Sequence, residues 1–236
     1  MDKIKESIIN NNITLIITTP FAKSLLITNI LNELSIKDNK KTVLFSFGIR
    51  SEYYFKKLLS FLSGINIRLI NKYLYPYATL SKNNKDKIES NNFISALEKI
   101  QSSNIIMIDQ NKFTYKEYLD YILNYNEIET IIIDNFNSIL SNEFYSIEEI
   151  FKIINKKNNK HYVFLVPDKN NEQDKIINKF SKYINNFILV NGNNYLDYRD
   201  IIIILKNKLK EKYLNIKFDK LNRIINDKES IWIKNI

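Results

Sequence analysis

Residues 13–34 read ITLIITTPFAKSLLITNILNEL, and this stretch decides the fold. Its first six residues, ITLIIT, are short, β-branched and apolar, which predicts a buried strand over 13–18. Apolar residues then recur at Leu26, Ile30 and Leu34, which predicts a helix over 23–34. A buried strand that leads into an amphipathic helix is the repeating unit of α/β proteins.

The same alternation continues through most of the chain. Further strands are predicted at 42–47, 105–108, 131–133, 161–166 and 187–190, and a closing pair at 201–205 and 213–218. Helices are predicted at 51–62 with Ser51 as N-cap, 85–100, 114–123 with a Thr114–Glu117 capping box, 147–154 and 172–183. Continuously apolar strands indicate a mostly parallel sheet with helices on both faces. The length of 236 residues fits one such α/β domain over residues 1–236.

The composition excludes several classes of protein. The chain has no cysteine and one histidine, His161, so disulfides, thiolate metal sites and sites that need two histidines are excluded. No apolar run approaches the roughly 20 residues of a membrane span, and the N-terminus does not resemble a secretory signal. We therefore expect an intracellular, cytoplasmic protein without a membrane partner. The three glycines lie far apart, which excludes an intact glycine-rich phosphate loop.

The charge of the chain has two explanations. Its 35 Lys and Arg exceed its 26 Asp and Glu to give a net charge of +9, which suits a polyanion such as single-stranded DNA. An AT-rich genome would produce the same lysine-rich composition without selection for charge. Lys206, Lys208, Lys210 and Lys212 alternate in the predicted closing hairpin. On one face of a strand they could follow a phosphate backbone, or they could protect an edge strand from aggregation.

Ligands of parallel sheets bind beyond the carboxyl ends of the strands, so residues at these positions are the candidates for a site. Thr19, Lys23 and Ser24 follow the first strand. Lys23 and Ser24 stand where a phosphate loop has its lysine and its magnesium-binding hydroxyl. Asp134 ends the fourth strand, at the position of a carboxylate that orders the magnesium ion.

Residues 13 to about 226 resemble the RecA-like motor domain of DnaB-type replicative helicases. Residues 41–64, KTVLFSFGIRSEYYFKKLLSFLSG, are similar to the second strand of that family and its following helix. Residues 129–140, ETIIIDNFNSIL, are similar to its strand that ends in aspartate, and residues 201–224 resemble its closing hairpin. The resemblance implies a RecA-like fold of the P-loop NTPase type, ATP and magnesium as cofactors, assembly into rings and a role in DNA replication.

The chain departs from this family at the positions that handle nucleotide. Ile17 and Ala22 stand where the loop glycines would be, although the loop needs their conformational freedom and small size. The catalytic glutamate of the family falls on Ile49, its glutamine falls near Pro167, and its Lys-x-Arg finger is replaced by lysines at 206 and 208. Lysine lacks the planar fork that arginine offers to a phosphoryl group.

The sequence therefore predicts a degenerate DnaB-like domain without ATPase activity and without a cofactor. Thr19, Lys23, Ser24 and Asp134 are its vestigial nucleotide-binding residues, with Asp134 a metal ligand only if the domain is active. Such a domain would act in DNA replication by binding single-stranded DNA, a replicative helicase or another replication protein, or copies of itself. One alternative is a divergent but active helicase that uses ATP and magnesium, with Glu52 as a substitute base. Another is an unrelated α/β protein-interaction module.

Overall fold

A computed structural model describes residues 2–74, 84–109, 117, 120, 124–140, 146–155, 160–168, 172–184, 186–194, 199–207, 211–218 and 224–230. The first half contains α1 (Asp2–Ile9), β1 (Ile13–Thr18), α2 (Pro20–Leu31), a π-helical segment η1 (Asn32–Lys37), β2 (Thr42–Ser46), α3 (Ser51–Ser63), α4 (Ile67–Leu74), α5 (Asn84–Gln101) and β3 (Ile105–Asp109). The second half contains β4 (Thr130–Asp134), α7 (Phe136–Leu140), α8 (Ile147–Asn155), β5 (His161–Pro167), α9 (Gln173–Phe180), β6 (Asn186–Asn194), β7 (Arg199–Asn207), β8 (Glu211–Phe218) and β9 (Ile224–Ser230).

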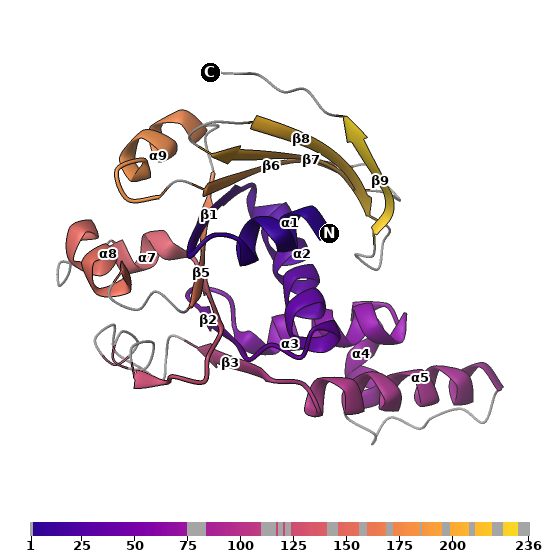
Figure 1. Cartoon of the computed structure of the whole chain (residues 1–236). Helices are drawn as coiled ribbons and strands as arrows, with labels where there is room; N and C mark the ends of the chain where they lie inside the picture. Colours follow the sequence, from indigo (N-terminus) through magenta and orange to yellow (C-terminus); the bar gives the residue numbers. More distant parts are fainter. Residues whose placement is uncertain are drawn as a thin grey trace.

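One nine-stranded sheet runs through the molecule in the order β3-β2-β4-β5-β1-β6-β7-β8-β9 (Figure 1). The strands from β3 to β6 in this order are parallel, and β7, β8 and β9 continue the sheet in antiparallel pairs. The predicted α/β fold, with a mostly parallel sheet and a C-terminal antiparallel extension, is confirmed. The sequence did not predict β9, which adds a third strand to the expected hairpin.

The parallel strands are buried on both faces, as their apolar sequences require. Leu15 and Ile17 of β1 belong to a core cluster with aromatic residues of α7, α8 and α9, whereas Ile16 belongs to a second cluster with residues of α1 and α2. Successive strand residues thus alternate between two cores. Figure 1 shows the two groups of helices on opposite sides of the sheet.

A third apolar cluster joins α3, α4 and α5, which together are called the α3–α5 lobe. Leu59 of α3, Ile70 of α4 and Phe93 of α5 are buried within it, and the ring of Tyr73 stacks on Phe93 with 5.5 Å between centroids. Gly64 ends α3 with a φ of 74°, a left-handed conformation that glycine adopts without a steric penalty. The lobe is therefore a packed unit whose helix α3 also reaches the sheet.

Several boundaries differ from the sequence prediction. Helix α2 begins at Pro20, three residues before the predicted start, and it continues into η1, where the amide of Asp38 donates to the carbonyl of Glu33. Ser51 is the first residue of α3 and Arg50 is its cap, so the predicted capping role of Ser51 is wrong. Of the predicted helix 114–123, Glu117 and Asp120 are helical, and the rest, Thr114 included, lies outside the described residues.

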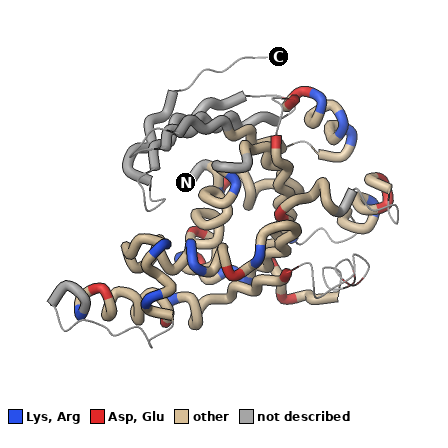
Figure 2. The backbone as a smooth tube through the Cα atoms, turned by 180° about the vertical axis from the view of Figure 1, so that it is seen from behind, with Lys and Arg blue, Asp and Glu red and all other residues tan. Residues whose placement is uncertain are grey.

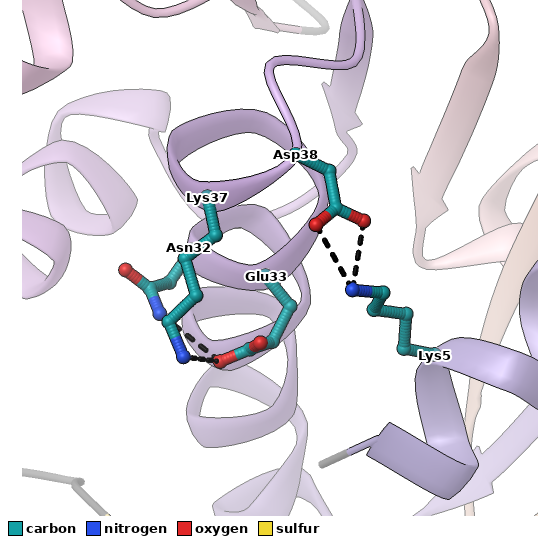
Figure 3. Close-up of polar contacts among 5 residues, drawn as sticks. All are labelled: Lys5, Asn32, Glu33, Lys37 and Asp38. Atoms are coloured by element: carbon teal, nitrogen blue, oxygen red, sulfur yellow. Dashed lines mark hydrogen bonds and ion pairs between the residues drawn. The ribbon is translucent and has the colours of Figure 1, made fainter.

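The end of α2 carries a set of charged contacts near the surface, shown in Figure 3 and called here the surface polar cluster. Lys5 of α1 lies 2.8 Å from Asp38 Oδ2, and Lys37 lies 2.8 Å from Glu33 Oε1. The amide of Asn32 also donates to Glu33, at 3.2 Å. Among the helices of the described residues, none has both the length and the apolar character needed to cross a membrane.

Candidate functional site

The connection between β1 and α2 is one residue long. Strand β1 ends at Thr18, helix α2 begins at Pro20, and Thr19 lies between them as the N-cap. Its side-chain oxygen accepts from the amide of Ala22 at 3.4 Å, and its carbonyl accepts from the amide of Lys23 at 3.2 Å. The expected loop over Thr18 to Ser24 is therefore replaced by a capped helix, which is a correction to the sequence prediction.

A phosphate loop binds its ligand with backbone N–H groups that have no partner within the protein. At this junction Pro20 has no N–H, and the N–H groups of Ala22 and Lys23 are bonded to Thr19. Asparagine, serine and threonine caps satisfy helix donors in the same way in ordinary helices. The start of α2 is thus built as an ordinary capped helix and not as a phosphate cradle.

The two positions that correspond to loop glycines are core positions. Ile17 is fully buried inside β1 and pairs with Val166 of β5 and Leu189 of β6. Ala22 is also fully buried, in the cluster formed with α1 and the sheet. A side chain at each position contributes to the core, so the missing glycines are accounted for by packing.

Lys23 and Asp134 form a buried ion pair. The ammonium of Lys23 lies 2.8 Å from Asp134 Oδ1, and the side chains are 8% and 0% exposed. Asp134 ends β4 and Lys23 lies in the first turns of α2, so the pair connects the sheet to the helix. The sequence prediction that these two residues lie together is confirmed, although their roles with a nucleotide are not tested by this geometry.

Helix α3 adds two side chains to this pair. The hydroxyl of Tyr54 donates a hydrogen bond to Asp134 Oδ2, and the ammonium of Lys57 donates to the hydroxyl of Ser24 at 2.7 Å. All five residues are buried. The group formed by Lys23, Ser24, Tyr54, Lys57 and Asp134 is called the buried polar cluster.

Two physical effects keep Tyr54 a hydrogen-bond donor. Burial, followed by the nearby charge of Asp134, raises the pKa of Tyr54 far above its usual value. The phenol therefore stays protonated over the physiological range and donates to the carboxylate. Lys57, in turn, lies 5.3 Å from the ring centroid of Tyr53, within the range of a cation–π contact.

These residues do not fit a magnesium nucleotide. Magnesium takes oxygen ligands in octahedral geometry, usually one or two carboxylates together with water and phosphate oxygens. Here the Asp134 carboxylate already has an ammonium on one oxygen and a phenol on the other, and the Ser24 hydroxyl accepts from a second ammonium. Within the described part of the chain, no group of three or more His, Cys, Asp or Glu residues could hold a metal ion.

Other residues considered as substitutes for the family's catalytic groups have ordinary structural roles. Glu52 is half-exposed and pairs with Lys56, and the hydrogen bond and charge of Lys56 lower the pKa of Glu52, which makes it a weaker base. Asp109 accepts from the backbone amide of Ser51. The carbonyl of Ile49 accepts from Ser46.

The four lysines proposed to form a row do not belong to one strand. Lys206 is in β7 and Lys212 is in β8, whereas Lys208 and Lys210 lie outside the described residues. In the register of this pair, Lys206 is opposite Glu211 and Lys212 is opposite Leu205. The alternation rule applies within a strand, so the prediction of one continuous row is wrong.

The sequence reasoning missed the roles of Tyr54 and Lys57. A spacing of three residues places both on one side of α3, and this spacing was visible in the sequence. What the sequence could not show is that this side of α3 lies against the start of α2 and the end of β4. Long-range packing of that kind has no local signal.

Comparison with solved structures identifies the fold. No family model and no curated protein matches the sequence. The solved ATPase domain of one DnaB-like helicase has a TM-score of 0.66 at 16% identity, over 91% of this chain and 84% of that one. A second DnaB-like replicative helicase, described with its interactions with primase, has a TM-score of 0.67 at 14% identity, over 91% of this chain and 58% of that one. The flagellar accessory protein FlaH from Methanocaldococcus jannaschii has a TM-score of 0.52 at 10% identity, over 95% and 90% of the two chains.

These likenesses show that the chain has the RecA-like fold of DnaB-like helicase ATPase domains. The structural resemblance expected from the sequence is thereby confirmed at the level of fold. Fold does not fix function, because one fold carries many activities. The function has to be inferred from the site itself.

Proposed function

We propose that the chain is an intracellular DnaB-like domain that has lost ATP hydrolysis and acts in DNA replication by contact. The observation that carries this proposal is the capped start of α2, which leaves a one-residue connection where a phosphate loop would be. The engagement of Lys23, Ser24 and Asp134 within the protein supports it. In this proposal the domain works without ATP or magnesium.

Phosphoryl transfer depends on positioned donors and metal ions, and losing one such group typically costs about a hundredfold or more in rate. The measurement is ATP turnover by the full chain with magnesium and single-stranded DNA present. We expect no hydrolysis above the background without protein. Robust hydrolysis that disappears in Lys23→Ala would instead favour a divergent, active helicase.

The charge of the chain favours single-stranded DNA as a contact partner. Lys175, Lys179 and Lys182 are exposed and spaced by four and three residues, so they follow one face of α9 into the turn after it. Figure 2 shows basic residues on this helix. Glu172 pairs with Lys175 at 2.6 Å and offsets part of this charge. Lys206 and Lys212 are weaker candidates for the same role.

Salt dependence tests this contact. Each phosphate that the protein neutralises adds about −0.7 to the slope of log affinity against log salt for a single strand. We expect replacing Lys175, Lys179 and Lys182 by Gln to reduce the slope, and replacing Lys87, Lys99 and Lys152 by Gln to leave it nearly unchanged. The control removes the same charge from exposed lysines elsewhere.

A replication protein is the second candidate partner. The DnaB-like replicative helicase of similar fold is described in its interactions with primase. Flat, weak binding of single-stranded DNA at all salt concentrations would favour such a protein, or further copies of this chain, over nucleic acid.

A further inference from the structure

We propose that helix α3 is a built-in occupant of the site, and that it locks α2 to β4 without any ligand. Lys57 supplies a cation to the Ser24 hydroxyl, and Tyr54 supplies a donor to the Asp134 carboxylate. These are the two groups that the helicase resemblance assigns to a metal ion. The inference goes beyond the proposed function because it concerns how the fold is held together in the absence of nucleotide.

The geometry of α3 makes this occupation possible. Tyr54 and Lys57 are three residues apart, so they project from the same side of the helix, one turn from each other. Tyr54 reaches the end of β4, and Lys57 reaches the first turns of α2. One face of one helix therefore contacts both elements that a bound nucleotide would have to bridge.

Burial gives these contacts their importance. Tyr54 is 0% exposed and Lys57 is 6% exposed, so neither polar group is compensated by bulk water. A buried ammonium requires hydrogen-bond acceptors, and a buried carboxylate requires donors or a cation. The buried polar cluster meets part of both needs internally, and hydrogen bonds are stronger in a medium of low dielectric constant.

The α3–α5 lobe is affected by the same contacts. Its own apolar cluster holds α3, α4 and α5 together, and α3 carries the lobe to the sheet through the buried polar cluster. The position of the lobe is consequently set by side chains of this chain and does not require a ligand between α2 and β4.

A double-mutant cycle on Lys57 and Ser24 tests the lock, using urea unfolding of the full chain without nucleotide. We expect Lys57→Met, which keeps most of the stem, to raise the unfolding equilibrium constant about tenfold, equivalent to about 1.4 kcal/mol. Ser24→Ala should have an effect in the wild type that is at least about threefold larger than in the Lys57→Met background. Additive effects would overturn the proposal, whatever the ATP turnover of the chain.

Lysine acylation of the wild type gives a second measurement that needs no variant. The exposed Lys37 and Lys175 serve as internal references, since their side chains are 59% and 77% exposed. We expect Lys57 and Lys23 to react at least about tenfold more slowly, because reaction requires local opening. Acylation of Lys57 at the rate of Lys37 would contradict the lock. If Lys57→Met fails to fold, this measurement decides.

Discussion

Helix α2 carries a cluster of charged residues at each of its two ends, and the two clusters differ in burial. At its start, Lys23 and Asp134 are 8% and 0% exposed. At its other end, beyond η1, Lys5 and Asp38 are 26% and 27% exposed. Both pairs have ion-pair distances of 2.8 Å, so distance alone does not distinguish them.

The surrounding medium distinguishes them. An exposed pair is screened by water and salt and contributes about 0 to 1 kcal/mol, whereas removing one partner of a buried pair leaves an uncompensated charge at a cost of roughly 3 to 5 kcal/mol. The buried polar cluster should therefore behave as a structural element, and the surface polar cluster of Figure 3 should be nearly dispensable.

The largest effect is expected for Lys23→Met, which leaves the Asp134 carboxylate buried with Tyr54 as its remaining partner in the cluster. We expect the free energy of unfolding to fall by roughly 3 to 5 kcal/mol, measured by urea denaturation. The double variant Lys23→Met with Asp134→Asn should recover much of this loss, since no buried charge is then left alone. A loss no greater than that of Lys37→Met would remove the distinction between the two clusters.

Tyr54→Phe comes next. The change keeps the ring and its packing but removes the donor to Asp134, and leaving a buried acceptor without its donor costs about 1 to 3 kcal/mol. The matched control is Tyr53→Phe on the neighbouring position, whose side chain is 40% exposed. Equal stability of the two variants would show that the phenol of Tyr54 contributes no hydrogen bond to the carboxylate.

The same residue predicts a dependence of stability on alkaline pH. The folded-state pKa of Tyr54 is raised by burial and by Asp134, whereas the unfolded pKa is about 10. Above pH 10 the unfolded chain therefore releases a proton that the folded chain keeps, and stability falls with a slope of up to about 1.4 kcal/mol per pH unit from this group. Tyr54→Phe should lose this part of the slope, and unfolding curves of both proteins between pH 9 and about 11 provide the measurement. Parallel curves would contradict the assignment.

The smallest effects belong to the surface polar cluster. Lys5→Ala should change the free energy of unfolding by less than about 1 kcal/mol, and the effect should shrink as salt is added. Lys37→Ala should cost slightly more, because its partner Glu33 is 9% exposed and retains Asn32 as a donor. Thermal melts at low and high salt check both. A loss equal to that of Lys23→Met would contradict the ranking.

The sequence predicted the sheet well because burial on both faces leaves a strong local signal. The apolar runs 13–18 and 131–133 coincide with β1 and the centre of β4. The pairing of Lys23 with Asp134 could also be anticipated, since both follow the carboxyl ends of strands in one parallel sheet. These inferences need only periodicity and topology.

The remaining features of the site depend on packing or on boundaries. The start of α2 was placed at Lys23 because its apolar period begins there, whereas the cap at Thr19 starts the helix at Pro20. Tyr54 and Lys57 contact the site because α3 lies against α2 and β4, which no local pattern reports. Element ends and contacts between distant segments are the parts of a fold that a single sequence specifies least visibly.

The most direct test of the account is a calorimetric titration of the wild-type chain with ATP and magnesium. The closed connection after β1 and the occupied buried polar cluster predict no saturable binding heat, with or without magnesium. Tight, magnesium-dependent binding that is weakened by Ser24→Ala would contradict the central claim, because it would require the cluster to open and its residues to hold the nucleotide.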